Sequence, residues 1–286
     1  MNYRHAYHAG NFADVLKHVI LARVIEHLKA KPQAFRVIDT HAGVGRYDLG
    51  GSEAAKTSEW RDGIGRLMQA TVSDDVSALL EPYLSTVRDM NGSGPPQVYP
   101  GSPLIARTLM RRDDQLVANE LHSEDFLELK ALFHKVRDSK ALNLDAWVAV
   151  KSLLPPKERR GLVLIDPPFE RADEFECIAD GLEEALRRFA TGIYIVWYPL
   201  KDERAADRFI AKVRTAGGAK GLDVRFQIRQ PGPDTGLAAN AILIINPPYK
   251  LKGELAVLLP FLVATLAQDS TAAFAINAWE DNKSLS

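Results

Sequence analysis

The sequence predicts an α/β fold with an open, mostly parallel sheet that is covered by helices. Short apolar runs alternate with amphipathic segments along most of the chain, which is typical of alternating strands and helices. Two late runs are separated only by a Pro/Gly-rich loop and predict an antiparallel hairpin that ends the sheet. A long interval between the first two runs predicts a helical insertion.

The composition is that of a soluble globular protein. Of the 286 residues, 46% are hydrophobic and 26% are charged, and the formal net charge is -1, which excludes disordered, collagen-like and coiled-coil classes. The lone Cys177 can neither close an internal disulfide nor supply a zinc cluster, so a reducing cytoplasm is expected. No signal peptide or membrane span is expected, because residues 1–10 lack an apolar core and the uncharged residues 255–267 are too few. No apolar stripe calls for a partner, so we expect a monomer.

The expected elements follow in chain order. Asn11 can cap a helix, with Asp14 three residues later, and the apolar residues that follow recur at helical spacing over about five turns. Strand-like runs then occupy residues 35–40, 115–120, 141–145, 162–166 and 193–198, with amphipathic segments at 123–136, 146–154, 173–189 and 202–215. The hairpin is expected from residues 223–229 and 237–246.

The hairpin and the insertion define the expected architecture. An open parallel sheet that ends in an antiparallel hairpin is, by analogy of fold, the Rossmann-like arrangement of class I S-adenosylmethionine-dependent methyltransferases. The interval after the first strand is far longer than an ordinary connection, and residues 58–90 within it have a helical pattern. The sequence therefore predicts a core domain of residues 1–48 and 99–286, which includes the first helix, and a helical insertion of residues 49–98.

A glycine loop and two acidic strand ends indicate a nucleoside cofactor. The first run ends in DTHAGVG at residues 39–45, a tight turn at the carboxyl end of a parallel strand, where open α/β sheets bind ligands. Glu120 ends the second run and can accept both ribose hydroxyls of NAD or S-adenosylmethionine, although it can equally be a solvated strand end. Asp145 ends the third run and can reach an adenine amino group, cap the helix that begins at Ala146, or do both. The G-x-G-x-x-G fingerprint is absent, which disfavours an NAD-dependent dehydrogenase.

The string Asp166-Pro167-Pro168-Phe169 after the fourth strand indicates methyl transfer to an exocyclic amino group. The two prolines hold the chain stiffly outward at the end of the strand. A purine amino nitrogen is a poor nucleophile until its lone pair is turned out of conjugation. An acidic side chain and the fixed carbonyl of Pro167 can accept both N–H bonds and turn it. We expect Asp166 to orient the amino group and Phe169 to stack on the base.

A second string, NPPY at residues 246–249, matches the aminomethyltransferase motif even better by its letters. It follows the last hairpin strand, which is expected to run antiparallel to the rest of the sheet. Its end should then lie on the opposite edge from Gly43 and Glu120. We therefore assign the catalytic role to Asp166.

Together these strings resemble the RlmJ family, which methylates the N6 of an adenine in bacterial 23S ribosomal RNA. The matching motifs occur in order: YRH at residues 3–5, HAGN at 8–11, DVLKH at 14–18, DTHAG at 39–43, YPGSP at 99–103 and IDPP at 165–168. The likeness continues to WYP at 197–199 and NPP at 246–248. It implies a class I fold with a helical insertion and S-adenosylmethionine as the methyl donor. No metal is expected, because the sulfonium of the donor supplies the driving force.

The resemblance also implies which residues form the site. Cofactor binding is expected from residues on the first helix and at strand ends: His18, His41, Ser102, Glu120, Asp145, Ala146 and Asp166. Asp166 is expected to be catalytic with Pro167 and Phe169, and Tyr3 and Lys17 are expected on the side of the substrate RNA. Ser102 followed by Pro103 is typical of a helix N-terminus, which can bind a carboxylate or simply be capped. The chain departs from the family at Phe169, where many relatives have Tyr, and at Ala146, where Gly is common.

RNA binding also needs positive charge. Basic runs at residues 157–160, 111–112 and 187–188 are candidates for phosphate contacts, although such runs are more often solvated surface. Arg4, Lys17 and residues of the insertion are better placed, through their link to the N-terminal motif.

The sequence therefore predicts a 23S rRNA adenine-N6 methyltransferase that transfers the methyl group directly and releases S-adenosylhomocysteine. A DNA adenine-N6 methyltransferase remains an alternative, because the Asp166 site reads the base and not the sugar. A non-catalytic RNA-binding assembly factor on the same fold is a second alternative, against which the intact Asp166 argues.

Overall fold

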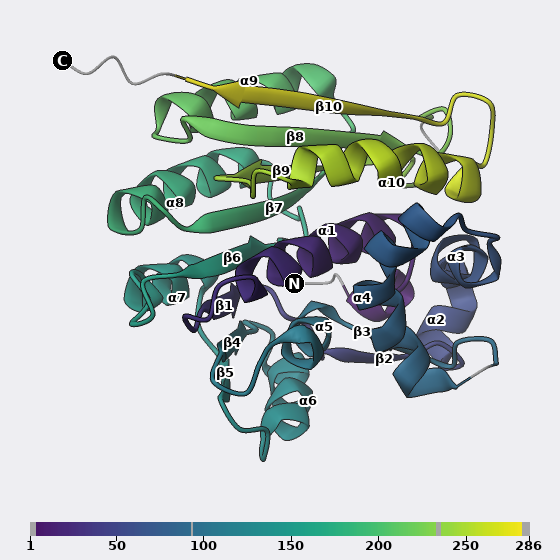
Figure 1. Cartoon of the computed structure of the whole chain (residues 1–286), viewed down its shortest axis with the longest axis horizontal. Helices are drawn as coiled ribbons and strands as arrows, with labels where there is room; N and C mark the ends of the chain where they lie inside the picture. The colour runs from purple at the N-terminus through teal and green to yellow at the C-terminus, as the bar shows by residue number, and fades with distance from the viewer. Residues whose placement is uncertain (1–3, 93, 233–235, 282–286) are drawn as a thin grey trace.

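A mixed eight-stranded sheet is the centre of the molecule, in the order β10-β8-β9-β7-β6-β1-β4-β5. The computed structural model describes residues 4–92, 94–232 and 236–281 (Figure 1). The strands of this sheet are β1 (Arg36–Asp39), β4 (Gln115–Asn119), β5 (Ser139–Leu142), β6 (Gly161–Ile165), β7 (Ile193–Pro199), β8 (Lys220–Gln227), β9 (Ala239–Ile245) and β10 (Ala273–Glu280). The neighbours from β5 to β7 are parallel, whereas β9 runs antiparallel to both β7 and β8, and β10 runs antiparallel to β8. This order and the antiparallel end confirm the expected class of fold.

Helices cover both faces of this sheet (Figure 1). One buried apolar cluster includes side chains of α1 (Phe12–Lys29), α5 (Ser102–Leu109), α6 (Ser123–Phe133) and α10 (Leu251–Leu266). The other includes side chains of α7 (Ala146–Leu153), α8 (Glu174–Arg188) and α9 (Glu203–Thr215). Because apolar strand residues alternate between the two clusters, the parallel strands are buried on both faces. Among the described helices, none is both long enough and apolar enough to cross a membrane.

The long interval after β1 forms a helical segment beside the sheet (Figure 1). A two-stranded ribbon of β2 (Arg46–Asp48) and β3 (Val98–Pro100) closes its base. Between these strands lie α2 (Ser52–Thr57), a π-helical turn η2 (Arg61–Gly65), α3 (Arg66–Gln69) and α4 (Asp74–Asn91). Within residues 58–90, where the sequence predicts a helical pattern, Gly63 departs from helical geometry and Ala70 is extended, so the segment is divided into η2, α3 and α4. The longest piece, α4, contacts α1 and α10.

Most boundaries of the predicted elements are confirmed, and a few are wrong. Asn11 does cap α1, because its side chain accepts hydrogen bonds from the Ala13 and Asp14 amides. The third strand ends at Leu142 and not at Asp145, since the Asn143 side chain donates to the Glu120 and Leu121 carbonyls and turns the chain away. Helix α6 ends at Phe133, before the expected residue 136. The prediction did not include α10 and β10.

Candidate active site

The loops that follow the parallel strands surround one large cleft. It has a volume of about 960 Å³, within the range of small-molecule sites. Its walls include the glycine loop after β1, the end of β4, the start of α7 and the DPPF string after β6. Residues of the N-terminal motif and of α1 also line it. The cleft therefore lies at the carboxyl edge of the parallel strands, where the sequence predicts it.

Glu120 is held at the end of β4 by the glycine loop. Its Oε2 accepts a hydrogen bond of 2.8 Å from the Gly43 amide, and its Oε1 accepts one of 2.8 Å from the His122 amide. Gly43 has a φ of 58°, and a Cβ atom there would lie 2.2 Å from the Tyr47 hydroxyl, so only glycine fits. Burial raises the pKa of Glu120. Each carboxylate oxygen retains capacity to accept from a ligand hydroxyl.

Asp39 is a buried neighbour of the site that the sequence did not identify as a site residue. Ser102 is the first residue of α5, but its hydroxyl does not cap the helix. Instead it donates a hydrogen bond of 2.6 Å to Asp39 Oδ2, at the end of β1. Burial raises the pKa of Asp39 to about 7. Its position as the acidic residue at the start of the glycine loop is the sequence signal that could have identified it.

His41, Asp145 and Ala146 lie on the same side of the cleft. The His41 Nδ1 lies 2.8 Å from the Thr40 hydroxyl, and burial lowers the pKa of His41 to about 4, so the ring is neutral at pH 7. Asp145 Oδ1 accepts from the Trp147 and Val148 amides at 2.9 and 3.1 Å. Asp145 is therefore the N-cap of α7 and a residue of the cleft at once, and Ala146 is the first residue of that helix.

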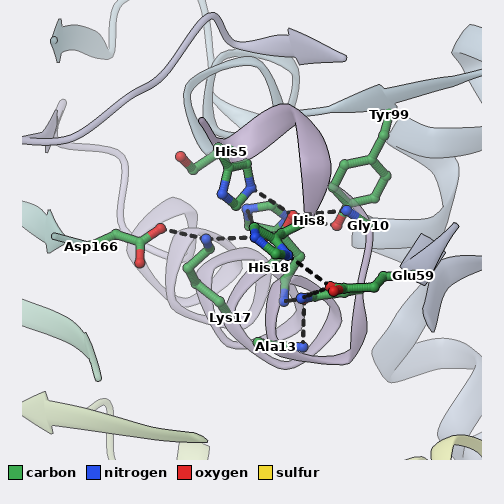
Figure 2. Close-up of polar contacts among 12 residues, drawn as sticks. His5, His8, Gly10, Ala13, Lys17, His18, Glu59, Tyr99 and Asp166 are labelled. Atoms are coloured by element: carbon green, nitrogen blue, oxygen red, sulfur yellow. Dashed lines mark hydrogen bonds and ion pairs between the residues drawn. The ribbon is translucent and has the colours of Figure 1, made fainter. Parts of the chain in front are cut away.

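His18 carries an unsatisfied polar atom at the wall of the cleft. Its side chain is 1% exposed, and its Nδ1 lies 2.7 Å from the Tyr99 hydroxyl, which in turn bonds the Tyr83 hydroxyl (Figure 2). Its Nε2 has no hydrogen-bond partner among the described residues. Burial lowers the pKa of His18 to about 3. A buried nitrogen without a partner beside a cleft fits a residue that a bound ligand completes.

A chain of charged groups connects the N-terminal motif to the end of β6 (Figure 2). Lys17 Nζ lies 2.5 Å from Asp166 Oδ2 and 2.7 Å from Asp14 Oδ1. Asp14 Oδ2 in turn accepts from the Gly10 amide and contacts His5 Nε2, both at 2.9 Å. Burial alone would lower the pKa of Lys17, but the two carboxylates outweigh it and raise that pKa. Lys17 therefore lies buried against Asp166 as a charged ammonium.

Phe169 lines the cleft beyond the two prolines. Its backbone φ is 52°, an uncommon conformation for a side chain of this size. Its ring meets Phe175 and Trp197 edge-on, with centroid distances of 5.2 and 5.9 Å. These contacts fix the ring at the wall of the cleft next to Asp166 and Pro167. Tyr3, which the sequence analysis places on the substrate side, lies outside the described residues.

Several cations of the basic runs have structural partners, and no residue of these runs lines the cleft. Arg160, just before β6, donates to the Leu28 and Gln33 carbonyls, and Glu158 pairs with Arg36. Arg111, before β4, binds Asp114 and carbonyls of residues 31–33. The pair at residues 187–188 binds Glu184. The runs at residues 157–160 and 111–112 stand at the amino ends of β6 and β4, on the edge of the sheet opposite to the cleft.

The NPPY string at residues 246–249 lies on the opposite edge, as predicted. The preceding strand β9 is antiparallel to β7, and Ile245 pairs with Tyr194 near the beginning of β7. The Asn246 side-chain amide donates to the Ala190 and Gly192 carbonyls at 2.8 and 2.7 Å. Among residues 4–92, 94–232 and 236–281, no group of three or more His, Cys, Asp or Glu side chains could hold a metal ion.

The chain is similar to known proteins over most of its length. The family described as "Ribosomal RNA large subunit methyltransferase D, RlmJ" matches residues 32–279. The Ribosomal RNA large subunit methyltransferase J of Escherichia coli K12 is 41% identical over 271 residues, which cover 95% of this chain and 96% of the relative. The protein of the same name from Haemophilus influenzae is 38% identical over 277 residues, with 96% and 98% covered.

A solved structure agrees as well. The crystal structure of a protein from Legionella pneumophila superimposes with a TM-score of 0.86 at 31% identity, and covers 95% of this chain and 98% of that protein. With the family match over residues 32–279 and these nearly full-length relatives, the chain belongs to the RlmJ family.

Proposed function

We propose that this protein transfers a methyl group from S-adenosylmethionine to the N6 of an adenine in 23S ribosomal RNA. The observation that supports this most is the position of the DPPF string. Asp166, Pro167 and Phe169 line the same cleft as the glycine loop and Glu120, in a chain of a ribosomal RNA methyltransferase family. A donor and an acceptor base can therefore meet in one cavity.

The donor would be held by the residues around β1, β4 and α7. Glu120 offers carboxylate oxygens to the ribose, and Asp145 Oδ2 is the oxygen of that side chain not used for capping. His41 and the unpartnered Nε2 of His18 offer neutral ring nitrogens, and Ser102 lies at the N-terminus of α5. When bound, S-adenosylmethionine supplies an electrophilic methyl group on a cationic sulfur.

The base would be oriented by Asp166 and Pro167. Lys17 occupies Asp166 Oδ2, which leaves Oδ1 to accept one N–H bond of the adenine amino group. The Pro167 carbonyl accepts the other bond, so the nitrogen lone pair turns out of conjugation and becomes nucleophilic. Phe169 supports the face of the base. Lys17 acts by holding the Asp166 carboxylate in place.

A transfer assay with radiolabelled S-adenosylmethionine tests this function. Deproteinised large-subunit rRNA from a strain that lacks the gene is compared with rRNA from the parent strain and with duplex DNA. We expect label in the first RNA only, as N6-methyladenine at one site, because the parent RNA is already modified. Efficient transfer to DNA alone would show a DNA methyltransferase, and no transfer to any substrate would contradict an enzymatic role.

A further inference from the structure

The insertion and the N-terminal motif are joined at one side of the cleft. The Glu59 carboxylate binds His8 Nδ1 at 3.0 Å and the Asn11 side-chain amide at 2.9 Å (Figure 2). The Ile64 amide donates to the Gly10 carbonyl at 2.9 Å. A Cβ atom on Gly63 would lie 2.1 Å from that same carbonyl, so the two backbones touch. His8 and Glu59 both line the cleft, and Tyr7 and Trp60 are their neighbours in the chain.

Two cation–aromatic pairs flank this junction. The Lys56 ammonium lies over the Tyr7 ring, 5.6 Å from its centroid. The Arg61 guanidinium lies over the Trp60 ring at 5.3 Å. Both cations are exposed and both rings are half-buried. We call the surface formed by Tyr7, Lys56, Trp60 and Arg61 the insertion rim.

The uncompensated charge of the insertion rim is positive. Each nearby acidic side chain has a partner: Glu53 pairs with Arg4, Asp62 pairs with Arg66, and Glu59 binds His8 and Asn11. By contrast, neither Lys56 nor Arg61 forms an ion pair or a side-chain hydrogen bond in the described part of the chain. The basic runs of the sequence differ, because Arg111 and Arg160 bind carboxylates and carbonyls and no residue of these runs lines the cleft. Lys56 and Arg61 are therefore available to an external anion.

We propose that the insertion rim binds the RNA that flanks the target adenine. Phosphate groups would meet Lys56 and Arg61, and unpaired bases would stack on Tyr7 or Trp60. Exposed cations beside aromatic rings are the combination by which proteins hold single-stranded RNA. The inference rests on the proposed function, since it assigns part of the same substrate to the insertion. It also explains why the insertion is fastened to the motif beside the cleft.

Removal of the two cations tests the proposal. The variant Lys56→Gln/Arg61→Gln is assayed on deproteinised large-subunit rRNA at several salt concentrations. We expect the KM for RNA to rise about tenfold with kcat within about twofold of the wild type. The dependence of log KM on log salt should become shallower by about 1.5, because each lost phosphate contact removes about 0.7 to 0.9. Both substitutions lie on the exposed surface, and a thermal unfolding curve checks that the fold is intact.

Two matched variants locate the effect. Arg112→Gln/Lys157→Gln removes the same charge at exposed positions before β4 and β6, and should leave KM and the salt slope unchanged. Lys201→Gln/Arg204→Gln removes two positive charges at exposed positions that follow β7, where Lys201 lines the cleft. A larger effect in this third variant, or equal effects in all three variants, would refute RNA binding by the insertion rim. Methylation of rRNA by the wild type would still support the proposed function. Absence of transfer by the wild type would instead overturn the function itself.

Discussion

Two strings of nearly the same letters stand at opposite edges of the sheet. Asp166-Pro167-Pro168-Phe169 follows β6, and NPPY at residues 246–249 follows β9. Both strands are fully buried, and both are apolar except for Asn240 in β9. However, β6 is parallel to its neighbours and β9 is antiparallel to its own, so the two strings emerge on different sides of the molecule.

The two strings differ in which polar atoms and aromatic rings remain available to bind a ligand. Asp166 faces the cleft with a buried ammonium on one oxygen only. Asn246 uses both hydrogens of its side-chain amide on the carbonyls of the turn before β7. Phe169 is held between aromatic edges, whereas Tyr249 is 77% exposed. We therefore expect chemistry to depend on the edge that a strand reaches and on the polar atoms still free there, and not on the letters of the motif.

The largest expected effect is from Asp166→Ala. This variant removes an acceptor for the adenine amino group, so the nitrogen lone pair is no longer held out of conjugation. We expect kcat to fall about 10³-fold, the size of the loss when one preorganised polar group of an active site is deleted. Single-turnover transfer to large-subunit rRNA measures it. Full transfer by Asp166→Ala would show that the assignment is wrong.

The matched change at the other edge is Asn246→Ala. It removes two hydrogen bonds to backbone carbonyls, so the free energy of unfolding should fall by about 1–2 kcal/mol. Urea denaturation measures this change. The kcat of the folded protein should stay at the wild-type value. A loss of methyl transfer with an unchanged unfolding curve would place chemistry at Asn246. It would refute the assignment of the catalytic role to the string after β6 alone.

An effect of similar size should appear in the pH dependence of stability, because the cleft edge holds buried titratable groups. The folded protein keeps His18 neutral down to a pKa of about 3, whereas the unfolded chain takes up the proton below 6.5. The free energy of unfolding therefore falls as the pH falls from 6.5, by about 1.4 kcal/mol per pH unit from this residue. The variant His18→Asn should remove that slope, about 2 kcal/mol between pH 6.5 and 5. Urea midpoints at several pH values measure it.

The difference in unfolding free energy between the wild type and His18→Asn, taken at each pH, isolates the contribution of His18. Asp39 acts in the opposite sense, because its pKa is raised to about 7 and its contribution is lost as the pH rises from 4 to 7. That contribution is present in both proteins and cancels. The exposed His134 provides the control, and His134→Asn should run parallel to the wild type. If the unfolding free energy of His18→Asn had the same pH dependence as that of the wild type, the buried neutral imidazole would be refuted.

The carboxyl edge of the sheet could be predicted from the sequence, but its charged contacts could not. Strand ends at Asp39, Glu120 and Asp166 follow from apolar runs, and parallel strands bring such ends together. The contact between Lys17 and Asp166 joins residues 149 positions apart, and no local pattern encodes it. The same holds for the bond between Glu59 and His8, which depends on how the insertion folds back.

The elements that the prediction missed have weak patterns for physical reasons. Helix α10 is apolar on nearly every side and contains Pro260, so it lacks a clear polar face. Strand β10 lies at the edge of the sheet and is mostly exposed, so its apolar residues do not alternate with polar ones. The partners of Arg111 and Arg160 could not be predicted either, since charge in the sequence does not show which carbonyls the side chains will bind.

The smallest expected effect compares the two aromatic residues. Phe169→Leu keeps apolar volume against Phe175 and Trp197 but removes the flat face for the base. Stacking of a base on an aromatic ring contributes about 1–3 kcal/mol, so kcat/KM for rRNA should fall about tenfold. Phe169→Tyr should retain activity because it keeps the ring. Tyr249→Leu, at an exposed ring of the opposite edge, should leave kcat/KM unchanged, since no part of that ring lines the cleft. Equal losses from Phe169→Leu and Tyr249→Leu would mean that the RNA contacts both edges, and that the edge alone does not decide which string acts on the base.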